Sequence, residues 1–397
     1  MNKKPPLSAF LTPILISGLI LASALHFGTV KAATEVTGII SSDTTWTKTN
    51  SPYNLTGPTA IGEGVTLTIE AGVTVNLNHY DIEINGSLIA RGNAADKIVF
   101  NSGDIKFIHE SNDWNDETQS GSILEHAILN CPLDTGNASI KIIHNSFTQG
   151  LDVGGSSSII SQNTITSSVG SDWWGRPLYK GTGLYVSGNA YVSDNVIFGS
   201  FTAAAVTISG SPTIQRNVIS NDYGYGSADY HQAGILIHVS SALVQNNTIE
   251  KNAIGISIGD NSSPTVIYNN IQDNTNYNIY SHSQSNINVT YNWWGTTDTQ
   301  AINQTIYDSK YDFHLGTVSF VPFLTAPNPE ATRDPNAPIP TPTISPSPSP
   351  TSSPDQTPTP TPKEPQTIQF ETILGVVIMV AVIGTGLGLL VYLIKRK

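Results

Sequence analysis

The middle of the chain repeats a six-residue pattern: an apolar residue, two variable positions, Asn, one variable position and a second apolar residue. The copies contain Asn145, Asn163, Asn195, Asn217, Asn247, Asn269 and Asn292, and an earlier copy has Ala127 at this position. From Ala127 onwards, successive copies are 18, 18, 32, 22, 30, 22 and 23 residues apart. A fixed pattern at a period of about 20 residues is typical of a solenoid.

The spacing within this pattern predicts a bend in every copy. The apolar residue and the Asn are three positions apart, so one straight strand cannot point both side chains inward. Asn tolerates the left-handed backbone conformation, and we therefore expect it at a tight corner. Stacked in successive coils, the Asn amides would hydrogen-bond to one another as a ladder.

A second pattern lies between the copies of the first. It consists of alternating apolar residues, often after Gly, at Leu151/Val153, Leu184/Val186, Val206/Ile208, Ile235/Ile237 and Ile256/Ile258. Together the two patterns predict three short strands per coil, each paired in parallel with its equivalent in the next coil. A β-sandwich would instead require hairpin signals at shorter spacing.

Strand patterns continue towards both ends of this region. In the opening segment, apolar residues alternate at Val65, Leu67 and Ile69 and again at Val73, Val75 and Leu77. This alternation predicts strands in the segment before the repeats.

The two patterns and the closing motif Asn292–Gly295 resemble right-handed parallel β-helix proteins of the pectin-lyase-like class. Within that class they are most similar to secreted or surface-anchored repeat proteins of archaea and bacteria. The resemblance covers residues 35–325 and implies an all-β, single-stranded, right-handed solenoid, the usual hand of parallel crossovers. It also implies that residues 34–107 form the first coils, with Trp46 and Tyr53 capping the first rung, and that Tyr311–Leu324 is the closing strand. The NosD-like copper-accessory group is another relative by resemblance. Copper favours His, Cys and Met ligands, and the chain has one Cys and two Met.

Composition divides the chain into further segments. Lys3 and Lys4, an apolar run and small residues near Ala33 predict a secretory signal peptide. A Pro/Thr/Ser-rich stretch predicts a disordered stalk, and the apolar run after it is long enough to span a bilayer. The predicted organisation is a signal peptide (1–33), a β-helix (34–325), a stalk (326–369), a transmembrane helix (370–394) and a basic cytoplasmic tail (395–397).

Charge and cysteine content narrow the classes of partner. The net charge is −12 and only 12% of residues are charged, so the chain lacks the basic footprint of a nucleic-acid-binding protein. The single Cys131 has no internal disulfide partner, and we expect it to be a buried apolar residue. Glycosylation sequons, which suit an exterior protein, lie at Asn54, Asn85, Asn137, Asn246, Asn261, Asn288 and Asn303.

Two insertions predict a ligand-binding face. The two longest steps in the repeat place Thr166–Gly183 and Ser220–Ala233 at the same corner, and insertions in repeat proteins mark the binding face. Aromatic faces and nearby hydrogen-bonding groups suit a sugar chain. The predicted ligand-binding residues are Trp173, Trp174, Arg176, Tyr179, Tyr185, Tyr223, Tyr225, Tyr230 and His231. Alternatively, these aromatic residues pack on the coils beneath them.

Catalysis is a weaker prediction from the same surface. Outward positions of the Gly-pattern strands would form a groove floor of Asp152, Tyr185, Ser187, Thr207, Ser209, Leu236, His238 and Ser257. The resemblance implies a calcium-holding acid cluster and a basic residue in a lyase; a glycosidase needs two carboxylates roughly 5–10 Å apart. The floor has one carboxylate and one His, and the insertions add Asp172, Asp222 and Asp229.

Two groups of side chains are candidate metal ligands. Asp113, Asp116 and Glu117 would suit Ca²⁺, although they lack the spacing of a known calcium loop, and a solvated acidic loop is the alternative. His126 and His144 occupy the position before the Asn in successive coils, about 4.8 Å apart. They would suit Zn²⁺ or Cu²⁺, but two ligands do not complete a site. We therefore expect no bound cofactor.

In the same column, Asp194 and Arg216 predict an ion pair between coils.

The function expected from the sequence is a membrane-anchored surface protein that binds or organises envelope components, either glycan or a neighbouring protein, without catalysis. One alternative is a membrane-anchored polysaccharide lyase or glycoside hydrolase. Another is an inert spacer or adhesin scaffold.

Overall fold

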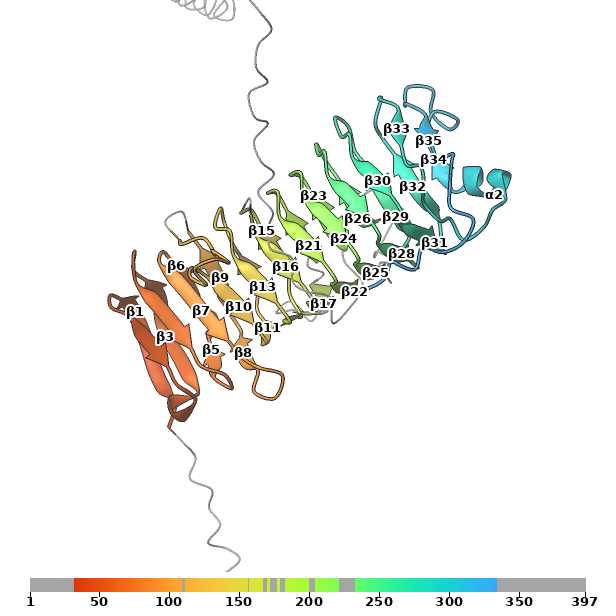
Figure 1. Cartoon of the computed structure of the whole chain (residues 1–397). Coiled ribbons are helices and arrows are strands. Elements are labelled where there is room, and N and C mark those ends of the chain that lie inside the picture. Colours follow the sequence, from red (N-terminus) through yellow and green to blue (C-terminus); the bar gives the residue numbers. More distant parts are fainter. Residues whose placement is uncertain are drawn as a thin grey trace, which may run out of the picture. The chain divides into compact units, whose positions relative to one another are not determined.

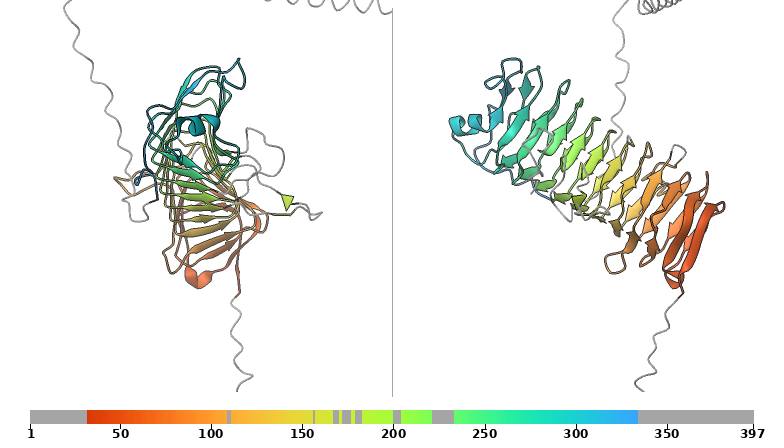
Figure 2. Two further views of the ribbon diagram at one scale, coloured as in Figure 1. Left: turned by 90° about the vertical axis from the view of Figure 1, so that its right-hand side faces the viewer. Right: turned by 180° about the vertical axis from the view of Figure 1, so that it is seen from behind.

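Successive coils of the chain stack on one another, and each strand pairs in parallel with its equivalent one coil further along (Figure 1). The computed structural model describes residues 32–108, 111–155, 157–166, 183–199, 204–220 and 233–333, together with the backbone of 170–171 and 177–178. Seen from behind, the strands follow one another along the solenoid in the same order (Figure 2).

The strands form three parallel ladders. The pre-Asn ladder contains β2 (Thr44–Trp46), β4 (Thr66–Ile69), β7 (Ser87–Arg91), β10 (Ile123–Glu125), β13 (Lys141–Ile143), β16 (Ile159–Ser161), β21 (Tyr191–Ser193), β24 (Thr213–Gln215), β27 (Leu243–Gln245) and β30 (Thr265–Ile267). The post-Asn ladder contains β5 (Thr74–Asn76), β8 (Ile98–Asn101), β11 (Ala127–Asn130), β14 (Ser146–Phe147), β17 (Thr164–Thr166), β22 (Val196–Phe198), β25 (Val218–Ser220), β28 (Thr248–Glu250) and β31 (Asn270–Gln272).

The third, the Gly ladder, carries the Gly pattern. It contains β6 (Asp81–Ile84), β9 (Asp104–Phe107), β12 (Leu133–Asp134), β15 (Leu151–Val153), β20 (Leu184–Val186), β23 (Val206–Ile208), β26 (Ala233–Ile237), β29 (Ile254–Ile258), β32 (Tyr277–Ser281) and β34 (Ile306–Tyr307). The first coil adds β1 (Thr34–Ile40), which pairs with the long strand β3 (Tyr53–Ile61). Because β3 also pairs with β5 and β6, it joins the post-Asn and Gly ladders.

Inward side chains of all three ladders form one continuous apolar core. Leu67, Val75 and Cys131 are buried in it, as the alternating pattern predicts. At its start, Trp46 and Tyr53 are buried and stacked, with ring centroids 4.8 Å apart. These two rings therefore fill the first end of the core.

The other end is closed by several short elements. Strand β33 (Ile287–Asn288) pairs with β35 (Val318–Ser319), which lies within the predicted closing segment. Helix α2 (Thr299–Gln304) was not predicted, because a helix this short shows no apolar period. It begins after Asp298, whose carboxylate accepts hydrogen bonds from the backbone N–H groups of Gln300 and Ala301. Trp294 is buried at this end, and its ring centroid lies 6.3 Å from that of Phe320.

The corner itself differs from the prediction. The left-handed residue is the one before each Asn, with φ between 50° and 59° at His126, His144, Gln162, Asp194, Arg216, Asn246, Tyr268 and Tyr291. The Asn instead turns its amide into the core, where its Nδ2 donates to the Asn of the next coil at 2.9–3.1 Å. Placing the Asn inward satisfies buried backbone groups that would otherwise lack a partner.

The solenoid also extends further than expected. Residues 326–333 were assigned to the stalk, but they pack on the coils, where they bond to corner residues before the Asn and to post-Asn strands. Asn328 donates from its backbone N to Asn270 Oδ1 at 2.8 Å and from Nδ2 to Asn246 Oδ1 at 3.0 Å, and Ala331 is fully buried. We call residues 325–333 the C-terminal strap.

Residues 334–397 and 1–31 lie outside the described residues, so the remaining stalk, the transmembrane helix and nearly all of the signal peptide stay predictions. In the part of the chain that the structure describes, no helix has both the length and the apolar character needed to cross a bilayer.

Candidate functional site

The outer face of the Gly ladder presents one row of side chains in register. From coil to coil the row reads Lys106, Asp134, Asp152, Tyr185, Thr207, Leu236, Ser257, Tyr280 and Tyr307. Carboxylates are neighbours near the start of this row, and tyrosines are neighbours at its end. Because the row follows from strand pairing, the backbone positions are spaced about 4.8 Å apart.

Asp134 and Asp152 form a carboxylate pair on adjacent coils. They line a hollow of about 340 Å³ together with Tyr185, whose hydroxyl lies 2.9 Å from Ser209 Oγ. Partial desolvation, helped by the negative charge of Asp134, raises the pKa of Asp152 to about 6. A carboxyl with this pKa can hold a proton in mildly acidic solution and donate it to a bound molecule.

The sequence predicted Asp152 but missed Asp134. The strand Leu133–Asp134 has no preceding Gly, so it did not match the Gly pattern. Its position was nevertheless recoverable, because Asp134 lies 18 residues before Asp152, the same step that separates Ala127 from Asn145.

A tyrosine cluster occupies the end of the row. The rings of Tyr280 and Tyr307 are stacked at 4.2 Å, and those of Tyr307 and Tyr311 at 5.1 Å. Tyr277 meets both Tyr307 and Tyr311 edge-on. Tyr277, Tyr280 and Tyr311 line a hollow of about 500 Å³. Burial raises the pKa of Tyr277, and the nearby Tyr311 and Tyr307 add smaller contributions in the same direction. Its hydroxyl therefore stays protonated at neutral pH.

These tyrosines were also missed from the sequence. They come from strand β32, strand β34 and the turn after β34, and only Tyr280 and Tyr307 are related by the ladder register. Tyr277 lies on β32 itself, and Tyr311 reaches the stack from the turn after β34, which no repeat pattern indicated.

The predicted calcium cluster is used for other contacts. Asp116 accepts hydrogen bonds from Trp114 Nε1 at 2.9 Å and from Lys141 Nζ at 2.5 Å. Although burial acts to raise it, these two bonds lower the pKa of Asp116. Asp113 accepts from the backbone N–H of Ser139 at 2.6 Å. The ammonium of Lys141 thus supplies the positive charge that Ca²⁺ would have supplied to Asp116. These contacts favour a structural role for the acidic loop.

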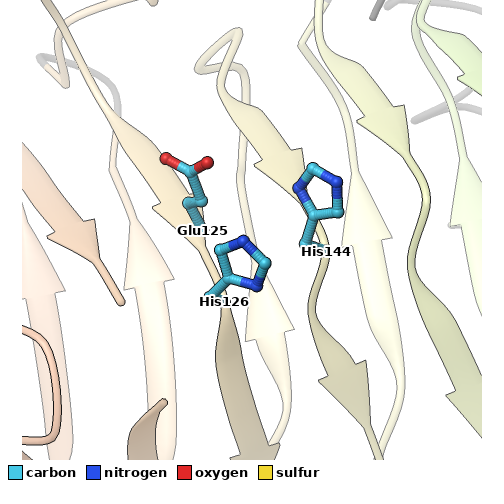
Figure 3. A group of neighbouring side chains, drawn as sticks. All are labelled: Glu125, His126 and His144. Carbon is cyan, nitrogen blue, oxygen red and sulfur yellow. The ribbon is translucent and has the colours of Figure 1, made fainter. Parts of the chain in front are cut away.

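The residues that precede the Asn of each coil make two contacts between adjacent coils. His126 and His144 are stacked, and Glu125 lies beside them (Figure 3). The sequence predicted the His pair without Glu125. Arg216 and Asp194 form a two-pronged ion pair at 2.8 and 2.7 Å. This is the ion pair between coils that the sequence predicted, and the Asp194 side chain is only 1% exposed.

Comparison with known proteins agrees with the architecture. Residues 182–304 match the family model described as right handed beta helix region, and the three parallel ladders continue the same coil on both sides of that match. The chain is a right-handed β-helix repeat protein. No curated protein and no solved structure matches it.

The two insertions leave the coil at the predicted corner, but most of their residues lie outside the described part of the chain. Both lie between a post-Asn strand and a Gly-ladder strand, after β17 and after β25. The first contains a short antiparallel pair, β18 (Gly170–Ser171) and β19 (Pro177–Leu178). The residues that lie outside the described part of the chain are Asp172, Trp173, Trp174, Arg176, Tyr179, Asp222, Tyr223, Tyr225, Asp229, Tyr230 and His231.

The groove floor of the β-helix is less continuous than expected. Leu236 and Ser257 are buried, so they do not line an open groove. His238 is exposed, but it follows the strand three coils beyond Asp152, which separates the two backbones by about 14 Å. The structure therefore brings Asp152 together with Asp134 and not with His238.

Proposed function

We propose that this β-helix is displayed on a cell surface, where it binds a glycan chain on the outer face of its Gly ladder without cleaving it. The single observation that supports this most is the stack of Tyr280, Tyr307 and Tyr311 beside a hollow of about 500 Å³. Tyr311 is exposed and Tyr280 and Tyr307 are partly exposed. Their accessible ring surfaces are flat and apolar with hydroxyls at the edges, which suits the alternating faces and hydroxyls of a sugar ring.

A glycan is favoured over a neighbouring protein as the ligand. Protein interfaces bury a broad apolar centre, whereas the Gly-ladder row is acidic at Asp134 and Asp152 and aromatic at Tyr280 and Tyr307. Its tyrosine cluster is a small aromatic surface with hydroxyl groups, which favours a sugar chain. Display at the surface rests on the predicted signal peptide, stalk and transmembrane helix.

Glycan-array binding by the full chain in detergent tests this proposal. We expect Tyr280→Ala/Tyr307→Ala to weaken binding at least about tenfold, equivalent to 1.4 kcal/mol. The matched control is Tyr268→Asn/Tyr291→Asn, which removes another exposed tyrosine pair, 5.8 Å apart, at left-handed corners that Asn tolerates. A wild-type chain that binds no glycan, or binding unchanged by the Tyr280/Tyr307 substitutions, would refute the proposed site.

Glycoside hydrolysis is the second candidate, favoured by the Asp134–Asp152 pair. Their backbones are about 4.8 Å apart, compatible with the separation of about 5–5.5 Å between the carboxyls of retaining glycosidases. In that case Asp152 would act as the acid. Because its pKa is raised to about 6, it is protonated below that pH, and activity would fall as the pH rises through 6.

Release of reducing ends from array-positive glycans distinguishes the candidates. A non-catalytic β-helix shows no release at any pH. Release that decreases above about pH 6 and is abolished by Asp152→Asn would instead establish the hydrolase. Asp134→Asn is the informative partner variant, since it removes the second carboxylate that a retaining glycosidase needs and should abolish release as Asp152→Asn does.

A further inference from the structure

Three metal-ligating side chains meet at one corner of the β-helix, away from the Gly ladder. Glu125 ends strand β10, His126 follows it at the corner, and His144 occupies the same corner one coil later. Figure 3 shows the two rings side by side with the Glu125 carboxylate next to them. Ligand atoms of all three lie within 4.8 Å of one another, and no other such group occurs among the described residues.

The backbone holds the two imidazoles in parallel. Both His residues are in the left-handed conformation, with φ of 50° and 59°, so the corner directs their side chains the same way from adjacent coils. The rings are stacked with centroids 4.6 Å apart and planes 10° apart. Strand pairing between β10 and β13 maintains this spacing, and the ring positions are therefore set by the ladder.

The hydrogen bonding of this corner is incomplete. Nδ1 of His144 is buried and lacks a hydrogen-bond partner among the described residues, a costly state for a ring nitrogen. A ring nitrogen without a hydrogen-bond partner can offer its lone pair to a metal ion.

We propose that Glu125, His126 and His144 bind one zinc-class divalent transition-metal ion, with the fourth position open to water. Two imidazoles and one carboxylate suit Zn²⁺ and are an unfavourable set for Ca²⁺ or Mg²⁺, which prefer oxygen ligands. The inference is independent of glycan binding, because the Gly ladder contributes no ligand.

The required movement is small. With bonds of about 2.0–2.1 Å, tetrahedral ligands lie about 3.4 Å apart, so the ligand atoms must close by roughly 1.4 Å from their 4.8 Å limit. Rotation of each ring about its side-chain bonds supplies this without moving the backbone. Arg91 Nε, 4.0 Å from Glu125, and Arg333, which also acts on His144, face the cluster and oppose the cation. We therefore expect micromolar rather than nanomolar affinity.

Calorimetric titration of the untagged full chain with ZnCl₂ tests the site. We expect one Zn²⁺ per chain and an affinity on the order of 100-fold lower in His126→Asn/His144→Asn, since even outer-shell changes cost 10–100-fold. Asn tolerates the left-handed corner, which protects the fold. The matched control is His79→Asn, because His79 is an exposed histidine in the same conformation (φ 67°), and its affinity should equal that of the wild type.

Electron paramagnetic resonance of the Cu²⁺-loaded wild-type chain gives a readout that needs no variant. Two equatorial imidazoles should produce hyperfine coupling to two nitrogens. Failure to bind Zn²⁺ saturably, binding unchanged by the double substitution, or coupling to no nitrogen would each overturn the proposal.

Discussion

At the scale of single residues, the inward-facing Asn accounts for the corner. Asn217 donates from Nδ2 to the backbone carbonyls of Val192 and Gln215 and to Asn247 Oδ1, and its own Oδ1 accepts from the backbone N–H of Asn195. One amide thus connects three successive coils. A residue without this amide would leave several of these groups buried and unpaired.

Replacement of Asn217 by Ala should therefore destabilise the β-helix strongly. We expect a loss of about 2–4 kcal/mol in the free energy of unfolding, because each buried group left unsatisfied costs about 1–3 kcal/mol. Urea unfolding followed by circular dichroism measures it. The control is Asn137→Ala, at an exposed Asn outside the ladder, which should change stability by less than about 0.5 kcal/mol. Equal stability of the two variants would contradict the role assigned to the ladder.

At the scale of elements, the C-terminal strap is held on the coils by a few hydrogen bonds. It has no strand of its own, and Asn328 supplies its main attachments to Asn246, Tyr268 and Asn270. The strap continues to Arg333, whose Nη2 donates to the backbone carbonyl of Gln162 at 3.3 Å. Segments held by few contacts open locally well before the whole molecule unfolds.

An Asn328→Ala variant should release the strap while leaving the coils folded. Hydrogen exchange is expected to rise at least about tenfold across residues 325–333, equivalent to 1.4 kcal/mol of local opening, with unchanged protection in strands β20 and β23. Glu330→Ala, at an exposed side chain of the same segment, provides the comparison and should exchange like the wild type. Exchange that stays slow in Asn328→Ala would mean that Asn328 does not attach the strap.

At the scale of the whole molecule, the stack of coils separates two surfaces. The Gly ladder carries the carboxylate pair and the tyrosine cluster. The corner after the pre-Asn ladder carries the His pair, and the strap reaches the same corner at Asn246 and Gln162. Each coil contacts only its neighbours in a solenoid. A ligand on one surface therefore acts mainly on the coils beneath it, which is why the glycan and metal tests are independent.

The repeat by itself was enough to determine the solenoid, the order of its strands, the stacking of the seven Asn residues and the neighbouring positions of His126 and His144. These follow from local periodicity, since a fixed spacing repeats the same backbone path in every coil. The sequence also indicated the corner, although it assigned the left-handed conformation to the Asn and not to the residue before it.

Only the tertiary structure decided which side chains from outside the pattern meet. Tyr311 beside Tyr307, helix α2 at the end of the core and the strap on the coils all depend on irregular segments. Such contacts join positions that are not related by a constant period, so no local pattern encodes them. Periodicity determined the scaffold, and the packing of its non-repeating parts determined the candidate sites.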